Sequence, residues 1–398
     1  MESVLILGTG LTGRSVARYL KDKSLFNFFD TRTKEELSQI FSNNREFLEN
    51  LKPYNQIDLN NYSRVICSPG FDIKHKIYQN IIRKKIPIET DIEIFTKKHD
   101  SKKILITGTN GKSSVCSMLE KILISNGFKA KAIGNIGLPV LDCIEENLDY
   151  SLIEVSSFHL KISNNLHCDV ATILNITEDH LDYHKTFEDY LKTKNSIFNK
   201  AKVKIGNEAN KHVISDVDIF FSTQNLEIEE QNLNAINAIL KSLNLEIDSR
   251  NSLENYSKLE HRFEIFHKDK KGRIFINDSK ATNIGAAKEA VKSAKKLGEV
   301  SVLCGGRGKG VDFNEFSNFL SINCKNIILF GEDKDQIKRN ISKEKLFEAK
   351  DLKEATEIAK KITLSDEVIL LSPACSSFDA FPSYEERGNI FKETVLNE

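Results

Sequence analysis

Short apolar segments alternate with amphipathic stretches along the whole chain. These segments have the length of buried β-strands, and helical patterns lie between most of them. The expected strands are Val4–Leu7, Ile104–Ile106, Ser151–Val155, Val170–Leu174, Ile274–Ile276, Val300–Cys304, Ile327–Phe330 and Val368–Leu371. Strands that alternate with helices in this way predict an α/β fold whose parallel sheets are covered by helices.

Two polar stretches divide this pattern into three parts. The first is Lys97–Lys103 and the second is Asp248–Glu254, and a new strand-rich series follows each of them. The chain has 398 residues, which is enough for two or three domains. We therefore predict three α/β domains, at residues 1–98, 99–258 and 259–398.

Composition and charge narrow the class of protein. The chain carries 57 basic and 57 acidic residues without a long run of one sign, which gives no support for a nucleic-acid or membrane partner. No apolar run approaches the ~18 residues that a membrane helix needs. Seven scattered cysteines without a C-x-x-C pair argue against disulfides or a zinc site. We expect a cytoplasmic protein, since the cytosol keeps thiols reduced.

A strand, a glycine-containing loop and a helical pattern follow one another around Gly108-Thr-Asn-Gly-Lys-Ser113. Glycines let backbone N–H groups close around phosphate oxygens, and a helix N-terminus favours the negative charge. Lys112 would bridge the β- and γ-phosphates of ATP, and Ser113 would reach Mg²⁺. Ile106 occupies the first glycine position of the general pattern, so the loop is a shortened form.

A second glycine loop, Gly8-Thr-Gly-Leu-Thr-Gly13, follows the first strand, and Asp30 ends the next apolar run. Taken alone, this loop fits the dinucleotide fingerprint of an NAD-dependent dehydrogenase. The phosphate loop at Gly108 leaves little room for a complete dinucleotide fold. A nucleoside diphosphate at the first loop and ATP at the second fit better. Two alternatives remain. One is an NAD-dependent dehydrogenase, and the other is a glycine turn that only allows close packing of strand and helix.

Two side chains with metal-binding chemistry follow strands of the central region. Glu154 stands near the end of one strand, and His180 follows the next. Ligands collect at the carboxyl ends of parallel strands, where the phosphate loop also opens. Mg²⁺ prefers oxygen ligands, so Glu154 is the stronger candidate. A helix-capping glutamate and a surface histidine are the alternatives.

These motifs resemble those of the Mur ligase family. The stretches that match it in order are Gly108–Ser113, Gly134–Gly137 with Asn135, Glu154–Phe158, Asn175–Asp182, Tyr190–Lys194 and His261-Arg262. The stretches typical of the family branch that adds D-glutamate are Asn277–Asn283, Leu371–Phe381, Tyr384 and Arg387-Gly388. The chain departs from the family at Leu233–Asn237, which lacks the His of a His-Asn-x-x-Asn motif, and at His159, where Gln is usual.

The resemblance implies an ATP-dependent, ADP-forming ligase with three domains. These would be an N-terminal Rossmann-like domain that binds UDP, a central P-loop ATPase-like domain, and a C-terminal Rossmann-like domain that binds the amino acid. The implied reaction joins D-glutamate to UDP-N-acetylmuramoyl-L-alanine through an acyl phosphate, in the cytoplasmic synthesis of peptidoglycan precursors. The implied cofactors are ATP and Mg²⁺, and the implied state is a monomer.

The resemblance also assigns roles to individual residues. The implied catalytic residues are Lys112, Asn135, Glu154, His180 and Lys194. The implied ATP contacts are Gly108, Thr109, Asn110, Gly111, Lys112, Ser113, Ser114, Asn234, Asn237, Arg262, Asp278 and Lys280. The implied UDP-substrate contacts are Leu11, Thr12, Asp30, Thr31, Arg32 and Gly70. The implied D-glutamate contacts are Thr282, Lys309, Ser377 and Tyr384, and the implied metal ligands are Ser113, Glu154, His180 and Lys194.

Lys194 is the residue for which spacing and resemblance disagree. It lies in the helical stretch Phe187–Phe198, and spacing alone predicts a solvated surface lysine. The resemblance implies instead that CO₂ carbamylates Lys194, which turns it into an oxygen ligand for Mg²⁺. The other functions left open are a sister Mur ligase that adds a different amino acid, a folylpolyglutamate synthase and an inactive binding protein.

Overall fold

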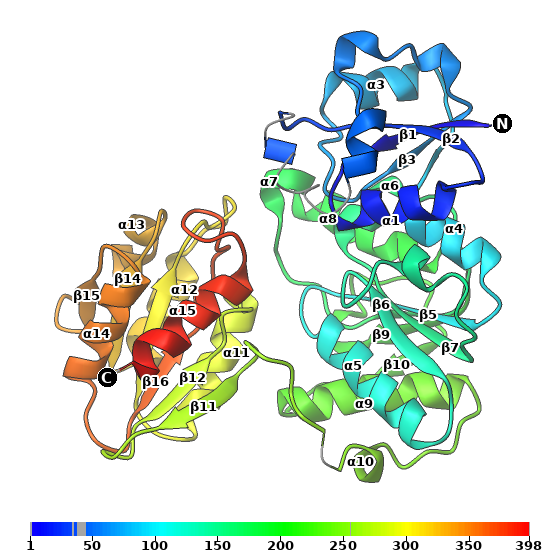
Figure 1. Cartoon of the computed structure of the whole chain (residues 1–398). Helices are drawn as coiled ribbons and strands as arrows, with labels where there is room; N and C mark the ends of the chain where they lie inside the picture. Colours follow the sequence, from blue (N-terminus) through cyan, green and yellow to red (C-terminus); the bar gives the residue numbers. More distant parts are fainter. Residues whose placement is uncertain (1, 34–35, 38–44, 255, 398) are drawn as a thin grey trace. The chain divides into compact units, whose positions relative to one another are not determined.

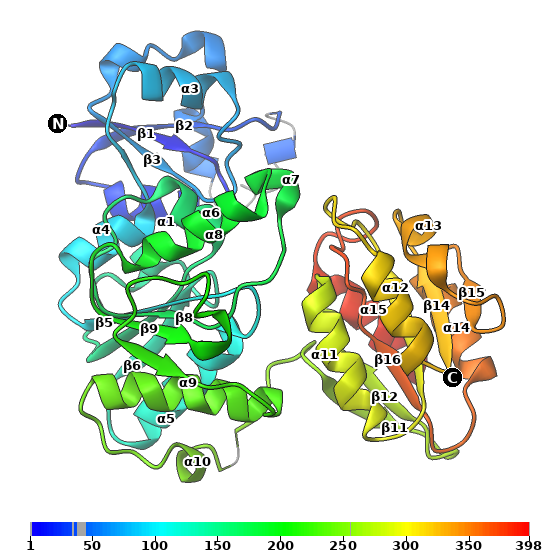
Figure 2. The same ribbon diagram turned by 180° about the vertical axis from the view of Figure 1, so that it is seen from behind.

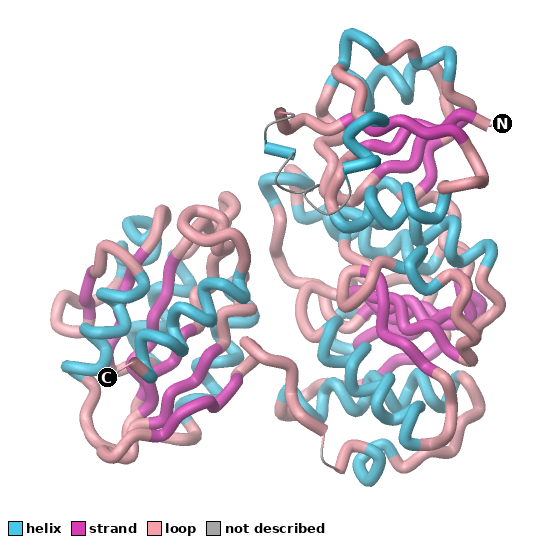
Figure 3. Tube along the Cα trace, viewed as in Figure 1, coloured by secondary structure: helices cyan, strands magenta, loops and turns pink. Residues whose placement is uncertain are grey.

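The strands of the computed structural model form three sheets within the described residues, which are 2–33, 36–37, 45–254 and 256–397 (Figures 1 and 3). The chain divides into two compact units. The first unit, Met1–Ile176 with Leu191–Asn255, holds the first two sheets. The second unit, Thr177–Tyr190 with Tyr256–Glu398, holds the third. Each range predicted as a domain contains one sheet.

The first sheet is parallel and has the strand order β2-β1-β3-β4. Its strands are β1 Ser3–Leu7, β2 Leu25–Phe29, β3 Arg64–Cys67 and β4 Ile88–Glu89. The helices of this region are α1 Leu11–Leu20, α3 Lys76–Arg83 and α4 Asp91–Lys98. Leu5 and Leu7 share a buried cluster with Ile77 and Ile81 of α3, so α3 covers one face of the sheet.

The second sheet is also parallel, with the order β10-β9-β8-β5-β7-β6. Its strands are β5 Lys102–Thr107, β6 Ala130–Gly134, β7 Tyr150–Glu154, β8 Cys168–Ile173, β9 Ala201–Asn207 and β10 Ile219–Phe221. The helices of this region are α5 Lys112–Ser125, α6 Ser157–Ile162, α8 Phe187–Asn195, α9 Ile228–Ser242 and α10 Ser249–Ser252. β5, β7 and β8 are adjacent, which brings their carboxyl ends to one edge.

The third sheet has the order β11-β12-β16-β13-β14-β15, and only β11 runs antiparallel to its neighbour among the strands described. Its strands are β11 Glu264–Lys268, β12 Ile274–Asn277, β13 Val300–Gly305, β14 Asn326–Phe330, β15 Leu346–Glu348 and β16 Val368–Leu371. The second unit also contains α7 Leu181–His184, α11 Ile284–Lys295, α12 Asn314–Asn323, α13 Lys334–Ile337, α14 Leu352–Ile362 and α15 Tyr384–Leu396.

Successive side chains of β13 enter the two opposite cores of the third sheet. Val302 packs in the cluster that contains residues of α11 and α12, whereas Leu303 packs in the cluster that contains residues of α14 and α15. Helices therefore cover both faces, as Figure 2 shows from behind. This confirms the predicted α/β class with parallel strands, and corrects it at the antiparallel β11.

The eight strands expected from apolar runs are present, with bounds shifted by a few residues at most. The strands that the pattern missed include β6, β9 and β11, whose sequences contain lysine or glutamate and so break the apolar run. Among the described helices, none combines the length and the apolar character needed to cross a membrane.

One glutamate ties α4 to the segment after α6 within the first unit. Glu93 closes a capping box with Thr90, whose backbone N–H it accepts at 2.9 Å. Its other carboxylate oxygen accepts the backbone N–H groups of Asn164 at 2.9 Å and Asn165 at 2.8 Å. Thr90 and Ser163 also share a hydroxyl–hydroxyl bond of 2.8 Å. These bonds join α4, the last helix of the first predicted domain, to the region that contains the second sheet.

Candidate active site

The phosphate loop connects β5 to α5, and its backbone is held by Asn175 at the end of β8. Asn175 accepts the backbone N–H of Thr109 with its carbonyl at 2.9 Å, and that of Asn110 with its side chain at 2.8 Å. Gly111 caps the helix with φ +84°, in the left-handed region. The predicted order of strand, loop and helix is therefore present, and α5 begins directly after the loop, where a helix N-terminus favours an anion.

Two lysine ammonium groups contact the carbonyls of this loop. Lys112 donates to the carbonyls of Gly108 and Thr109, each at 2.9 Å. Lys194 donates to the Gly108 carbonyl at 2.8 Å and to the Thr107 hydroxyl at 3.0 Å. The Lys194 residue is only 1% exposed, so the prediction of a solvated lysine from spacing is wrong. α8 supplies this lysine from a distant part of the sequence, which periodicity does not reveal.

Glu154 is buried at the end of β7 and accepts two side-chain hydrogen bonds. The Ser113 hydroxyl donates to one of its oxygens at 2.5 Å, and the Asn135 amide donates to the other at 2.7 Å. The Asn135 backbone N–H also donates to the Glu154 carbonyl at 3.0 Å. A Cβ on Gly134 would lie 2.8 Å from that carbonyl, so this approach requires glycine. Three predicted residues thus form one connected group beside the phosphate loop.

His159 is buried one turn beyond Glu154, on α6. Burial lowers the pKa of His159 to about 4, although the nearby Glu154 charge opposes the shift. Its Nδ1 lies 2.8 Å from the Ser156 hydroxyl, which also caps the helix. The ring is therefore neutral at pH 7. A neutral ring replaces the family's Gln without adding a positive charge to this site.

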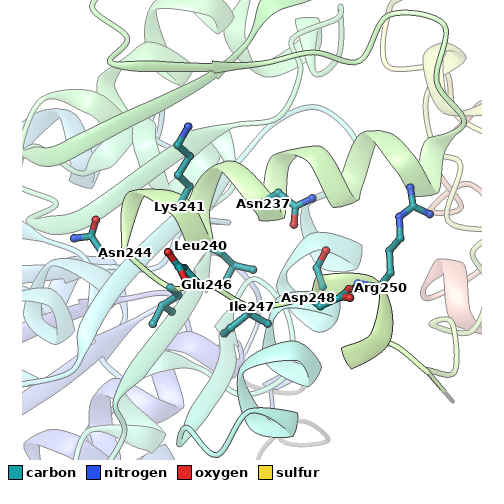
Figure 4. A pocket seen from close by; sticks show the side chains of 10 residues that line it. Asn237, Leu240, Lys241, Asn244, Glu246, Ile247, Asp248 and Arg250 are labelled. Atoms are coloured by element: carbon teal, nitrogen blue, oxygen red, sulfur yellow. Dashed lines mark hydrogen bonds between the residues drawn. The ribbon is translucent and has the colours of Figure 1, made fainter.

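The two asparagines predicted to contact adenine lie on α9. Asn234 donates to the Ser222 carbonyl at 3.0 Å. Asn237 lines a cavity of about 540 Å³ together with Lys241 and Arg250 (Figure 4). The asparagine of α9 that reaches the phosphate loop is Asn232, whose side-chain oxygen is 3.2 Å from the position of a Cβ on Gly111. The sequence analysis missed Asn232, since the incomplete motif offered no register.

The first glycine loop brings β1 and α1 into close contact. A Cβ on Gly13 would lie 2.0 Å from the Gly8 carbonyl, so glycine is required there. Asp30 accepts the Thr9 backbone N–H at 2.8 Å and a side-chain bond from Arg32 at 2.9 Å. Burial alone would raise the pKa of Asp30, but these donors outweigh it and lower the pKa to about 2. Thr9 is a member of this network that sequence reasoning missed.

The other residues predicted for the first domain lie around this network. Leu11 begins α1 with 67% of its surface exposed. Thr31 and Gly70 are exposed, and a Cβ on Gly70 would meet no atom of the described residues within 4 Å. Thr12 is half-buried. Leu11, Thr31 and Gly70 are therefore accessible to a ligand at this loop.

Two predicted residues of the second unit, His180 and Lys309, contact the same carboxylate. Asp179 accepts the His180 backbone N–H at 2.8 Å and the Lys309 ammonium at 3.0 Å. Burial raises the pKa of Asp179, but the charges of Lys309 and His180 outweigh it and the net shift is downward. Both His180 and Lys309 have left-handed backbones, with φ of +56° and +58°. Lys309 is therefore no free loop lysine.

A buried arginine joins the two motifs at the carboxyl ends of β12 and β16. Arg387 of α15 donates to the Ser279 hydroxyl at 3.0 Å, the Ser279 carbonyl at 2.8 Å and the Cys375 carbonyl at 3.0 Å. Its neighbour Gly388 packs on Asn277, and a Cβ there would lie 3.0 Å from that side chain. The resemblance included Arg387 in a motif without giving it a role. The structure assigns it to holding these loops together.

The residues of the second unit that were predicted to contact the nucleotide lie near the loops that Arg387 holds together. Asp278 accepts bonds from the Phe263 backbone and the Ser372 hydroxyl, both at 3.0 Å, and burial raises the pKa of Asp278 to about 7. The Lys280 ammonium lies 3.7 Å from the centroid of the Tyr384 ring. Thr282 and Arg262 are half-buried, whereas Ser377 is buried. Candidate nucleotide and amino-acid contacts thus share one edge of the third sheet.

Comparison with known proteins gives matches along nearly the whole chain. The MurD-like N-terminal domain of Mur ligases matches residues 2–90, the Mur ligase middle domain matches 106–276, and the Mur ligase glutamate ligase domain matches 261–375. A UDP-N-acetylmuramoylalanine–D-glutamate ligase of Francisella tularensis subsp. holarctica is 34% identical, over 99% of this chain and 96% of the relative. The protein of the same name from subsp. novicida is also 34% identical.

Solved structures of related ligases share the fold. The UDP-N-acetylmuramate-alanine ligase of Thermotoga maritima covers 100% of this chain with a TM-score of 0.61 and 16% identity. The MurF ligase of the same organism, in complex with ADP, covers 94% with a TM-score of 0.65 and 16% identity. A folylpolyglutamate synthase/dihydrofolate synthase of Yersinia pestis covers 77% with a TM-score of 0.57 and 15% identity. With three matching domain models and a relative 34% identical along almost its whole length, the chain belongs to the Mur ligase family of ATP-dependent ligases.

Proposed function

We propose that this protein joins D-glutamate to UDP-N-acetylmuramoyl-L-alanine with the conversion of ATP to ADP, in the cytoplasmic synthesis of peptidoglycan precursors. The names of the relatives that cover 99% of the chain support this reaction. The observation that carries the proposal is the group of Ser113, Asn135 and Glu154 beside the phosphate loop, with Lys194 buried against the same loop. An inactive binding protein would not need to keep all four of these residues.

The chemistry of the proposed reaction is mainly electrostatic. A carboxylate oxygen of the UDP-substrate attacks the γ-phosphorus of ATP, and ADP leaves. The amine of D-glutamate then attacks the acyl phosphate, and inorganic phosphate leaves with formation of the amide bond. Two anions must meet in the first step, so cationic and N–H donors that face the phosphoryl group lower its barrier. The α5 N-terminus and Lys112 would supply these donors.

Mg²⁺ fits the chemistry of the residues around Glu154. Its ligands are usually one or two carboxylates together with phosphate oxygens and water. Glu154 is a buried carboxylate, and the Ser113 hydroxyl points at it from the first turn of α5. No cage of three His, Cys, Asp or Glu side chains is present in the described part of the chain, so most ligands would come from nucleotide and water. A bound Mg²⁺ would neutralise charge on the phosphates, and His180 stays a predicted additional ligand.

We propose further that Lys194 acts as a carbamate. Its burial against Thr107 and Gly108 places the amine where a phosphate-bound cation would repel an ammonium. A carbamate converts that position from a positive charge to an oxygen ligand with negative charge, which a Mg²⁺ site accepts. Carbamylation requires the neutral amine, which burial and nearby cations favour.

The nucleotide and amino-acid contacts are proposed residue by residue. For UDP, Asp30 holds Arg32 while the Arg32 side chain stays 41% exposed, and its flat guanidinium would stack on uracil. The remaining proposed UDP contacts are Leu11, Thr12, Thr31 and Gly70. The further proposed ATP contacts are Ser114, Asn234, Asn237, Arg262, Asp278 and Lys280.

For D-glutamate, Lys309 is the main proposed contact. Its ammonium pairs with the carboxylate of Asp179, which is the group that a glutamate side chain also offers. The other proposed contacts are Thr282, Ser377 and Tyr384. We propose three functional domains at residues 1–98, 99–258 and 259–398, with Rossmann-like first and third domains and a P-loop ATPase-like second. We also propose that the protein acts as a monomer.

The test is an ADP-release assay with ATP, Mg²⁺, UDP-N-acetylmuramoyl-L-alanine and one amino acid at a time. We expect turnover with D-glutamate and little with L-glutamate, L-alanine or L-lysine. The control is Lys112→Ala, which removes the phosphate-loop ammonium and should abolish ADP release. Turnover that prefers another amino acid would instead identify a sister ligase.

A further inference from the structure

The loop that carries Lys309 has an unusual backbone. It follows β13, and left-handed φ values occur at Gly305, Gly306, Lys309 and Gly310. For glycine this conformation is inexpensive, but for lysine it costs about 1 kcal/mol or more. Lys309 keeps φ at +58° only if other contacts hold the loop. The position of the ammonium therefore depends on what holds this backbone.

Ser376, beside the proposed D-glutamate contact Ser377, holds one side of the loop. The Arg307 backbone N–H donates to the Ser376 carbonyl at 3.1 Å, and the Ser376 N–H donates back to Arg307 at 2.9 Å. This isolated antiparallel pair joins the loop after β13 to the loop after β16. It couples the two segments proposed to contact the amino acid, and it uses backbone groups alone.

Asp333, three residues after β14, holds the other side with its side chain. Its Oδ2 accepts the backbone N–H of Gly308, next to Lys309, at 2.7 Å. Its own backbone N–H donates to the Gly306 carbonyl at 3.0 Å. Its Oδ1 accepts the Gln336 amide of α13 at 2.6 Å, which fixes the carboxylate's orientation. One aspartate thus holds the loop at two points, on the two residues that flank Arg307.

We infer that Asp333 is a positioning residue for D-glutamate, acting through Lys309. Because a carboxylate that accepts a backbone N–H makes a strong, directional bond, Asp333 would maintain the left-handed turn at Lys309. The inference rests on the proposed function, since it assumes that Lys309 binds the amino-acid substrate. Asp333 itself has no contact with substrate in this assignment.

The test compares Michaelis constants of Asp333→Ala and wild type. We expect the KM for D-glutamate to rise about tenfold or more, as for the loss of one charge-assisted hydrogen bond, while the KM for ATP stays within about twofold. Asp333→Asn keeps one acceptor oxygen and should lie between. The matched control is Asp335→Ala, an exposed aspartate two residues away that pairs with Lys338. It should leave both constants unchanged.

A double-mutant comparison separates this inference from the assignment of Lys309. If Asp333 acts through Lys309, Asp333→Ala should add little to the KM of a Lys309→Ala variant. An unchanged D-glutamate KM in Asp333→Ala, or an effect that persists in full without Lys309, would overturn the inference. If Lys309→Ala alone leaves that KM unchanged, the proposed D-glutamate site is itself wrong. Should Asp333→Ala fail to fold, Asp333→Asn gives the same comparison.

Discussion

The ammonium of Lys194 lies 2.8 Å from the carbonyl oxygen of Gly108, so a residue of α8 contacts the first glycine of the phosphate loop. The two residues are 86 positions apart in sequence. Lys194 also contacts the Thr107 hydroxyl, at the end of β5. A change at Lys194 therefore reaches the phosphate loop directly.

Lys194→Ala should reduce ligase turnover by about 10²-fold or more, because it removes a charged group from the phosphate site. If the working form is the carbamate, acetate or formate should restore part of the activity, whereas an alkylamine should not. NMR with ¹³C-bicarbonate should show a carbamate carbon that the variant lacks. Lys192→Ala is the control, since Lys192 is exposed on the same helix. Rescue by the alkylamine would show that the ammonium, rather than a carbamate, is the working form.

The glycine loop of the first domain should bind the UDP-substrate and not NAD. The carboxylate of Asp30 is ionised and already bound by Thr9 and Arg32, which leaves a preformed polar site. In titration calorimetry, we expect heat with UDP-N-acetylmuramoyl-L-alanine and none with NAD. Asp30→Asn should weaken binding about tenfold by releasing Arg32, while Asp22→Asn, at an exposed position, should not. Binding of NAD in place of the UDP-substrate would restore the dehydrogenase interpretation.

The buried imidazole of His159 should make stability depend on pH. Its pKa falls from 6.5 to about 4 on folding, so the unfolded chain binds the proton more readily. The neutral His159 ring makes its full contribution to the free energy of unfolding above pH 6.5. That contribution falls by about 1.4 kcal/mol per pH unit as the pH drops from 6.5 toward 4. Urea unfolding at pH 7.5, 6 and 5 measures this slope.

The control for this slope is a pair of glutamine variants. His159→Gln should reduce the pH dependence, because glutamine does not titrate. His212→Gln, at an exposed histidine, should keep it. Equal slopes in the wild type and in His159→Gln would mean that His159 does not control this stability change.

Glu93 should stabilise the first unit by more than a helix cap does. Glu93→Ala removes the carboxylate that accepts the backbone N–H groups of Asn164 and Asn165, and it also breaks the capping box. We expect the free energy of unfolding to fall by about 2–4 kcal/mol, since two hydrogen bonds to a charged acceptor and a helix cap are lost together. Denaturant unfolding measures it, with Asp100→Ala at an exposed site as the control. A loss no larger than that of the control would contradict a bridging role.

Several parts of the site could be predicted from sequence because they are local. The strand, glycine loop, lysine and helix at residues 104–123 follow one another in the chain, and their order alone indicates a phosphate site. Glu154 could be placed because a parallel strand presents its last residue at the edge where ligands bind. Short buried strands were likewise predictable, since nearly continuous apolar runs mark them.

Other parts depend on contacts between distant segments. Lys194 has the spacing of a surface lysine, and only the packing of α8 beside β5 buries it. Asn232 was not predicted, because the register of α9 against the phosphate loop is set by packing. β11 was missed and runs antiparallel, which its polar sequence does not show.

The sequence by itself determined the α/β class, the order of the motifs and the family, because these follow from local periodicity and from residues that are adjacent in the chain. The tertiary structure alone decided which side chains share an environment. Asp333 meets the loop of Lys309, and Arg387 joins the loops of Ser279 and Cys375, because neighbouring parallel strands bring their carboxyl ends together. Strand order is a long-range property, since it reflects the free energy of packing the whole sheet rather than the preference of any one segment.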